Sequence, residues 1–356
     1  MKSAQTDRFV HDRLPAADQL PQLKFDLPEL QFPEQLNLVE ELLDNAAKKG
    51  FADRPMLRSP KVTLTYADVQ YRVDRMAQVL VDDLGLVPGN RVLLRGGNSI
   101  GMVLAWLAVV KAGLIAVATM PLLRAKELGE IIDKSQPTVA QCDAKLLEEL
   151  QLAQAQHPVL KTIVPFNVTM DEPGSLAARA ALKDGHFKAC PTAATDIALM
   201  AFTSGTTGKP KAAVHTHRDV LAACETWPRH VLCASCEDVV MGSPPLAFTF
   251  GLGGLLIFPM WAGASVYFPS KPYTPDGMAQ LMLDVGATIC YTAPTFYRQM
   301  APHLKAQMAQ RGRSALRICV SAGEALPDAT RQLWKDATGI EILDGIGATE
   351  MFHIFV

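Results

Sequence analysis

From Leu38 onward, the chain alternates short apolar runs with longer segments in which apolar residues recur at helical spacing. Such runs are typical of buried strands, and the recurring pattern is typical of the helices that cover them. The runs predict strands over residues 90–94, 114–119, 138–141, 197–203, 211–215, 288–292, 316–321 and 340–343. The recurring pattern predicts helices over residues 100–111, 124–135, 144–154, 295–304 and 328–338. Another helix is predicted to begin at Pro275, with Thr274 as its N-cap. This alternation predicts an α/β fold with mainly parallel sheets flanked by helices.

Two stretches depart from the alternation. Residues 1–37 contain four prolines, Pro15, Pro21, Pro28 and Pro33, and proline interrupts both helix and sheet. We therefore predict an extended N-terminal arm. Residues 165–195 show little periodicity and are the predicted seam between two lobes of a domain that spans residues 38–356.

One stretch, residues 101–120, is apolar enough to resemble a membrane span. However, Lys111 lies at its middle, where a charge in lipid is expensive, and Gly113 divides it. A buried helix followed by a core strand fits this pattern better than a membrane-spanning helix does.

Composition and charge narrow the functional class. The formal net charge of -2 argues against a general nucleic-acid-binding surface, so an anionic ligand needs a local set of donors. The seven cysteines are odd in number and scattered, which is typical of reduced thiols in a cytoplasmic protein. Cys233 and Cys236 form one C-x-x-C without the further ligands that a zinc site needs.

The most informative motif lies between two predicted strands and reads TSGTTGKPK. Glycines allow backbone N–H groups to converge on an anion, while the hydroxyls and the lysine add donors and charge. A Walker A loop is excluded, because Gly205 and Gly208 are too close and Pro210 occupies the position of the magnesium-binding hydroxyl. The predicted phosphate-binding residues are Thr203, Ser204, Gly205, Thr206, Thr207, Gly208 and Lys209.

Three motifs in order closely resemble the adenylate-forming superfamily, which includes acyl-CoA synthetases, peptide-synthetase adenylation domains and luciferases. They are the motif above, SAGEALP at residues 321–327, and DGIGATE at residues 344–350. The resemblance covers the chain from about residue 38 to its end. It implies the two-lobed N-terminal domain of such an enzyme, C-terminally truncated. The family usually has tyrosine where this chain has Ile346, a change that benzoate-type CoA ligases tolerate.

The resemblance also implies roles for individual residues. Thr349 would bind the α-phosphate, Glu350 would hold Mg²⁺, and Lys209 would stabilise phosphate charge during catalysis. The implied adenine-binding residues are Gly323, Glu324, Ala325, Asp344, Gly345, Ile346 and Gly347. The implied acyl-pocket residues are Phe248, Thr249, Phe250, Gly251, Tyr291 and His353.

The stretch PLAFTFGLG and the N-terminal arm resemble benzoate and 2-aminobenzoate–CoA ligases in particular. The expected function is therefore ATP-dependent activation of an aromatic carboxylic acid, followed by thioester formation with coenzyme A. Two alternatives remain open: an adenylation domain that loads a carrier protein, and a non-catalytic nucleotide-binding module. The sequence leaves open whether the protein is a homodimer.

The family's C-terminal domain carries an adenylation lysine, and a Thr-Gly-Asp motif precedes it. Neither follows Glu350 in this sequence. We therefore expect a fragment that folds but is weakly active or inactive by itself. We also expect the apolar residues 352–356 to be frayed or paired with a neighbouring molecule.

Overall fold

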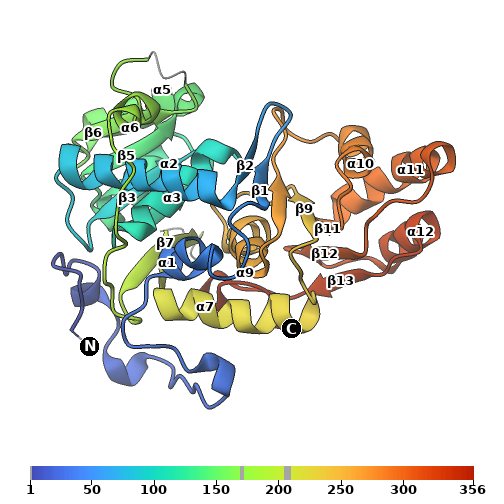
Figure 1. Cartoon of the computed structure of the whole chain (residues 1–356), viewed down its shortest axis with the longest axis horizontal. Helices are drawn as coiled ribbons and strands as arrows, with labels where there is room; N and C mark the ends of the chain where they lie inside the picture. Colours follow the sequence, from blue (N-terminus) through green and yellow to red (C-terminus); the bar gives the residue numbers. More distant parts are fainter. Residues whose placement is uncertain (1, 169–171, 204–209) are drawn as a thin grey trace. The chain divides into compact units, whose positions relative to one another are not determined.

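A computed structural model describes residues 2–168, 172–203 and 210–356. These residues form two compact units, each built around one sheet (Figure 1). The first unit comprises residues 1–45, 68–97 and 101–225, and the second comprises residues 46–67, 98–100 and 226–356. Residues 165–195, the expected seam, lie inside the first unit, and the last passage between the units falls near residue 225. The division therefore differs from the expected one.

The first unit has a six-stranded sheet with the order β6-β5-β3-β4-β7-β8 among the described residues. Its neighbours are parallel except for the β7–β8 pair, which is antiparallel. The strands are β3 Arg91–Arg95, β4 Ile115–Thr119, β5 Val139–Asp143, β6 Thr162–Phe166, β7 Ile197–Thr203 and β8 Lys211–Thr216. The α-helices are α1 Leu38–Leu42, α2 Tyr66–Gln78, α3 Ile100–Lys111, α4 Ala125–Ser135, α5 Leu147–Gln156, α6 Leu176–Ala181 and α7 His217–Thr226. Helices α4 and α5 share a core with strands β3, β4, β5 and β7.

The second unit has a seven-stranded sheet with the order β13-β12-β11-β9-β10-β1-β2 among the described residues. All its neighbours are parallel except the β1–β2 pair. The strands are β1 Pro55–Arg58, β2 Thr63–Thr65, β9 Val239–Gly242, β10 Ser265–Tyr267, β11 Ile289–Tyr291, β12 Ile318–Ala322 and β13 Ile342–Gly345. The α-helices are α8 Thr249–Leu252, α9 Phe258–Ala262, α10 Pro275–Asp284, α11 Pro294–Arg311 and α12 Asp328–Thr338. Helices α10, α11 and α12 pack on this sheet (Figure 1).

Local signals explain several element boundaries. The Thr274 hydroxyl accepts a hydrogen bond from the Gly277 N–H at the start of α10, and Pro275 occupies the first turn, as predicted. Helix α12 ends at Thr338 and is followed by Gly339, which adopts the left-handed conformation that favours glycine. The mainly parallel α/β architecture is confirmed.

The apolar stretch at residues 101–120 folds as expected, with α3 buried from Met102 to Lys111 and β4 after it. Lys111 is completely buried and lies between two carboxylates, 2.6 Å from Asp44 and also against Asp74. In the described part of the chain, no helix is both long and apolar enough to cross a membrane.

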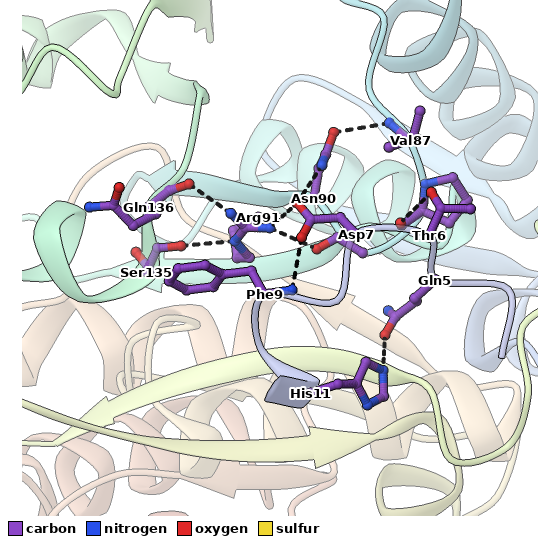
Figure 2. Close-up of polar contacts among 12 residues, drawn as sticks. Gln5, Thr6, Asp7, Phe9, His11, Val87, Asn90, Arg91, Ser135 and Gln136 are labelled. Carbon is purple, nitrogen blue, oxygen red and sulfur yellow. Dashed lines mark hydrogen bonds and ion pairs between the residues drawn. The ribbon is translucent and has the colours of Figure 1, made fainter. Parts of the chain in front are cut away.

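The N-terminal arm is irregular, with three short 3₁₀ helices at η1 His11–Arg13, η2 Ala17–Gln19 and η3 Pro28–Leu30. Its first residues are anchored to the first unit (Figure 2). Gln5 is buried, and its side-chain amide nitrogen donates to the Ile197 carbonyl while its amide oxygen accepts from the Ile197 N–H. All seven cysteines are free, and the described residues contain no group of three or more metal-ligating side chains.

Candidate active site

The sheet of the second unit places several predicted segments at one edge. Strands β9, β11, β12 and β13 are consecutive neighbours, all parallel (Figure 1). Ligands in parallel sheets bind beyond the carboxyl ends of the strands, which meet at one edge. Residues 244–251 follow β9, residues 323–325 follow β12, and residues 346–350 follow β13. The predicted acyl-pocket and adenine segments therefore come together at one edge of this sheet.

Polar side chains hold the loop after β9 in place. The Asn98 amide donates to the Pro244 carbonyl at 2.8 Å and accepts from the Leu246 N–H at 2.8 Å. The hydroxyls of Ser243 and Thr292 lie 2.6 Å apart and connect the ends of β9 and β11. Sequence reasoning missed Asn98, because nothing in the local pattern shows that residues 98–100 join the second unit.

The loop leads into α8, which carries three of the predicted acyl-pocket residues and has a fourth, Phe248, as its N-cap. A Cβ at Gly251 would collide with the Pro245 carbonyl, so this position requires glycine. Thr249 is buried, whereas Phe248 is 44% exposed at the start of the helix. The helix therefore presents Phe248 outward and uses Gly251 to pack closely under the loop.

An aromatic cluster forms around His353. Its ring centroid lies 5.4 Å from Phe250, 6.2 Å from Tyr291 and 4.7 Å from Phe258. Trp227 lies 5.4 Å from His353, and its indole N–H donates to the Tyr291 hydroxyl at 3.2 Å. Three predicted acyl-pocket residues thus touch one another, and Trp227 and Phe258 complete a cluster that the sequence pattern did not reveal.

His353 is neutral in this environment. The side chain is 3% exposed, and neither ring nitrogen has a hydrogen bond of ordinary geometry to a described residue. Burial lowers the pKa of the imidazole to about 3, and the Phe250 backbone only partly opposes this effect. The cluster is therefore an apolar aromatic box with one uncharged polar group. A small space beside Tyr291 and Phe258 measures only about 10 Å³, which holds at most one water molecule.

The predicted adenine segments are exposed. Gly323 has a φ of +90°, a conformation that favours glycine, and a Cβ there would point into open space. Asp344 is also exposed, and Ile346 is 65% exposed. An apolar side chain this accessible at a strand end offers a surface for a flat ring.

The last residues fold back onto this segment. Phe352, His353 and Ile354 are buried, and the backbone of Ile346 bonds to Phe355 and Val356. A Cβ at Gly345 would collide with Ile354, so glycine permits this close approach. The expectation that residues 352–356 fray is wrong for the buried residues 352–354, whereas Phe355 and Val356 are held through their backbone and keep exposed side chains.

Thr349 and Glu350 lie in the short 3₁₀ helix η9 Thr349–Met351, and the Glu350 side chain is exposed. Mg²⁺ is commonly held by one or two carboxylates together with substrate phosphates. A single accessible carboxylate of this kind fits that donor set without further protein ligands.

The phosphate motif belongs to the first unit. Thr203 ends β7 and Lys211 begins β8, and these two residues are paired across the antiparallel strands. The two strands that flank the motif are therefore paired with each other. The predicted residues Ser204, Gly205, Thr206, Thr207, Gly208 and Lys209 lie outside the described residues.

Residues 43–356 match the family described as AMP-binding enzyme. The chain belongs to this family. It is 32% identical over 329 residues to a benzoate–CoA ligase of Thauera aromatica, which covers 92% of this chain and 62% of the relative. It is 29% identical over 287 residues to an anthranilate–CoA ligase of Pseudomonas aeruginosa, covering 76% of this chain and 51% of the relative. The chain thus spans less than two thirds of the length of these relatives.

Solved structures resemble the chain in the same way. The anthranilate CoA ligase AuaEII, in complex with anthranoyl-AMP, matches with a TM-score of 0.84 and 31% identity, over 93% of this chain and 63% of that chain. A benzoate CoA ligase from Burkholderia xenovorans matches with a TM-score of 0.79 and 27% identity, over 90% and 63%. The two-sheet α/β fold is therefore that of adenylate-forming enzymes.

Proposed function

We propose that this chain forms part of an enzyme that activates an aromatic carboxylic acid with ATP and transfers the acyl group to coenzyme A. The single observation that carries the proposal is the aromatic box around His353, on the unit whose sheet edge also bears the adenine segments. The names of the relatives point to the same substrate class.

The chemistry has two steps. The carboxylate oxygen first attacks the α-phosphorus of ATP, forms the mixed anhydride acyl-AMP and releases pyrophosphate. The thiol of coenzyme A then attacks the acyl carbon and releases AMP. Both steps depend mainly on positioning and on stabilising the charge that develops on phosphate and carbonyl oxygens.

In this proposal, residues 203–209 bind the β- and γ-phosphates and Thr349 binds the α-phosphate. Glu350 supplies the carboxylate for Mg²⁺, which neutralises phosphate charge when bound. Asp344 accepts a hydrogen bond from the adenine amino group, and Ile346 covers one face of the ring. The exposure of Asp344 and Ile346 supports these last two assignments.

The acyl group would lie against Phe250, Tyr291 and His353. A neutral imidazole can accept a hydrogen bond from an amino or hydroxyl substituent on the ring without adding charge. No acidic residue occurs in residues 244–254, where an amino-acid adenylation domain would need an anchor for an ammonium group. The box therefore favours an uncharged aryl ring over an α-amino acid.

The proposal is tested by binding of non-hydrolysable acyl-AMP mimics, which need no catalytic turnover. We expect 2-aminobenzoyl and benzoyl sulfamoyl-adenosine to bind the chain at least about tenfold more tightly than sulfamoyl-adenosine in calorimetric titrations, since aryl burial is favourable. Phenylalanyl sulfamoyl-adenosine is the matched control and should show no such gain. Equal affinity for all of these compounds would contradict the proposal.

Turnover is tested separately on the natural gene product that contains the chain. We expect pyrophosphate exchange with benzoate or 2-aminobenzoate and thioester formation with coenzyme A. A related protein is named p-hydroxybenzoic acid–AMP ligase, so replacing coenzyme A with a carrier-protein thiol is an informative control. Exchange without any thioester would retain the first step and reject the second.

A further inference from the structure

A groove lies in the first unit; one of its lining residues, Lys211, pairs with Thr203 of the predicted phosphate-binding motif, and its other lining residues have no role assigned above. It runs between the N-terminal arm, the end of α4 and strands β7 and β8, and its volume is about 760 Å³. Sites for small molecules typically measure about 300–1,000 Å³. The groove is therefore large enough for an organic ligand.

The floor of the groove is apolar and continuous with the core. Val10 and Met200 are buried members of the core cluster, and Val214 of β8 packs against them. The Phe9 ring forms part of one wall. These side chains offer an apolar ligand body a surface that already belongs to the fold.

The arm side of the groove is held in a fixed position (Figure 2). Arg91 pairs with Asp7 and donates to the carbonyls of Ser135 and Gln136, both at 2.9 Å. Its guanidinium also lies 4.5 Å from the Phe9 ring. These contacts join the arm to the end of α4, so the wall is preorganised rather than formed by a loose tail.

Cationic side chains surround the apolar floor. Arg13, Lys134 and Lys211 line the groove, and neither ammonium group has an ion pair with any residue that the structure describes. Among the described residues that line the groove, Asp133 is the only one with a carboxylate, and the His157 imidazole lies 2.7 Å from it. The chain as a whole carries a net charge of -2, so this local excess of positive charge is not a general property of the surface.

We propose that this groove binds an amphipathic organic anion, with its apolar body on Val10, Met200 and Val214 and its charged end near Arg13, Lys134 and Lys211. A carboxylate or a phosphate supplies the same charge to these side chains. The proposal concerns binding at the groove and does not rest on the proposed ligase activity.

The test is calorimetric titration of the chain with octanoate, octyl phosphate and 1-octanol. Both anions are expected to bind saturably, and octanol at least about tenfold more weakly, because it lacks the charge that the cations recognise. The stronger of the two anions identifies the preferred headgroup. Equal binding of all three probes, or no saturable binding of either anion, would overturn the proposal.

Variants locate the site. We expect the double substitution Arg13→Gln and Lys134→Gln to weaken binding of both anions at least about tenfold. Lys126→Gln is the matched control, because Lys126 is exposed on the same helix but does not line the groove. Circular dichroism melting verifies that each variant folds. Unchanged binding in the double variant overturns the proposal, and so does loss of binding in a longer natural polypeptide, where another segment would fill the groove.

Discussion

Lys111 provides the sharpest test of how the first unit is stabilised. Its ammonium group is fully buried at the end of α3 and lies between the carboxylates of Asp44 and Asp74. Substitution Lys111→Met keeps the length and the apolar stem of the side chain but removes the charge. Two mostly buried carboxylates then remain without their cation.

The expected loss of stability is large. Removing one partner of a buried ion pair typically costs about 3–5 kcal/mol, because the other charge stays buried and unpaired. We expect a loss of this size for Lys111→Met near pH 8, where the carboxylates would otherwise be ionised. Substituting Asp74→Asn in addition should recover part of the loss, since it removes one of the two orphaned charges.

The loss should also depend on pH. Burial raises the pKa of Asp74 to about 6 and raises the pKa of Asp44, even though Lys111 lowers both. A folded pKa above the unfolded value means that the folded state binds the proton more tightly than the unfolded state does. These two sites therefore contribute more to the free energy of unfolding at low pH than at high pH. Without Lys111 both pKa values rise further, and the loss at about pH 5 should be roughly 1–2 kcal/mol smaller than at about pH 8.

Urea unfolding at the two pH values measures this difference. Circular dichroism follows the unfolding of the whole chain, and intrinsic fluorescence, which sums over four tryptophans including Trp106 on the same helix as Lys111, is a second probe. Substitution Lys126→Met is the control, because Lys126 is exposed. A loss below about 1 kcal/mol near pH 8, or one that grows in acid, would refute the reasoning.

Three further predictions concern the candidate site. Because the pKa of His353 is about 3, protonation of this group should not change the affinity for an aryl sulfamoyl-adenosine between about pH 6 and pH 8. The substitution His353→Leu should reduce the selectivity for the 2-aminobenzoyl over the benzoyl compound. Calorimetry measures both effects. Gly251→Ala should weaken aryl binding and lower the free energy of unfolding by about 1–3 kcal/mol, because the new Cβ would collide with the Pro245 carbonyl. Urea unfolding measures the change in stability, and a variant as stable as the wild type would contradict the prediction. Lys209→Ala in the full gene product should slow pyrophosphate exchange, because about 2.7–4 kcal/mol of transition-state stabilisation is lost. The free energy of unfolding should change by at most about 0.5 kcal/mol. An unchanged exchange rate would contradict this prediction.

Elements with strong local signals could be predicted from the sequence. The predicted bounds of α3, α12 and β7 agree with the structure residue for residue. Helix α3 and strand β7 are nearly continuous apolar runs, α12 has a clear apolar period, and a glycine follows each of these elements within two residues. Strand β9 has only four residues, Val239–Gly242, and strand β1 is equally short, so neither gives a clear period, and both were missed.

The candidate site divides in the same way. Three motifs could be recognised because each is an unbroken run of residues, at 203–209, 321–327 and 344–350. The sequence alone was therefore enough to place the chain among adenylate-forming enzymes. Trp227 and Phe258 were missed because each is an unremarkable aromatic residue until folding brings it against His353.

By itself, the sequence determined the alternation of strands and helices and the three motifs that resemble the adenylate-forming family, because both depend on residues that are close together along the chain. The tertiary structure decided which unit each segment joins: β1 pairs with β10, about 200 residues away, and residues 98–100 join the second unit through Asn98. It also decided that Lys111 has two carboxylate partners and that His353 is neutral. Burial and charge pairing arise from contacts between distant residues, and no local pattern encodes them.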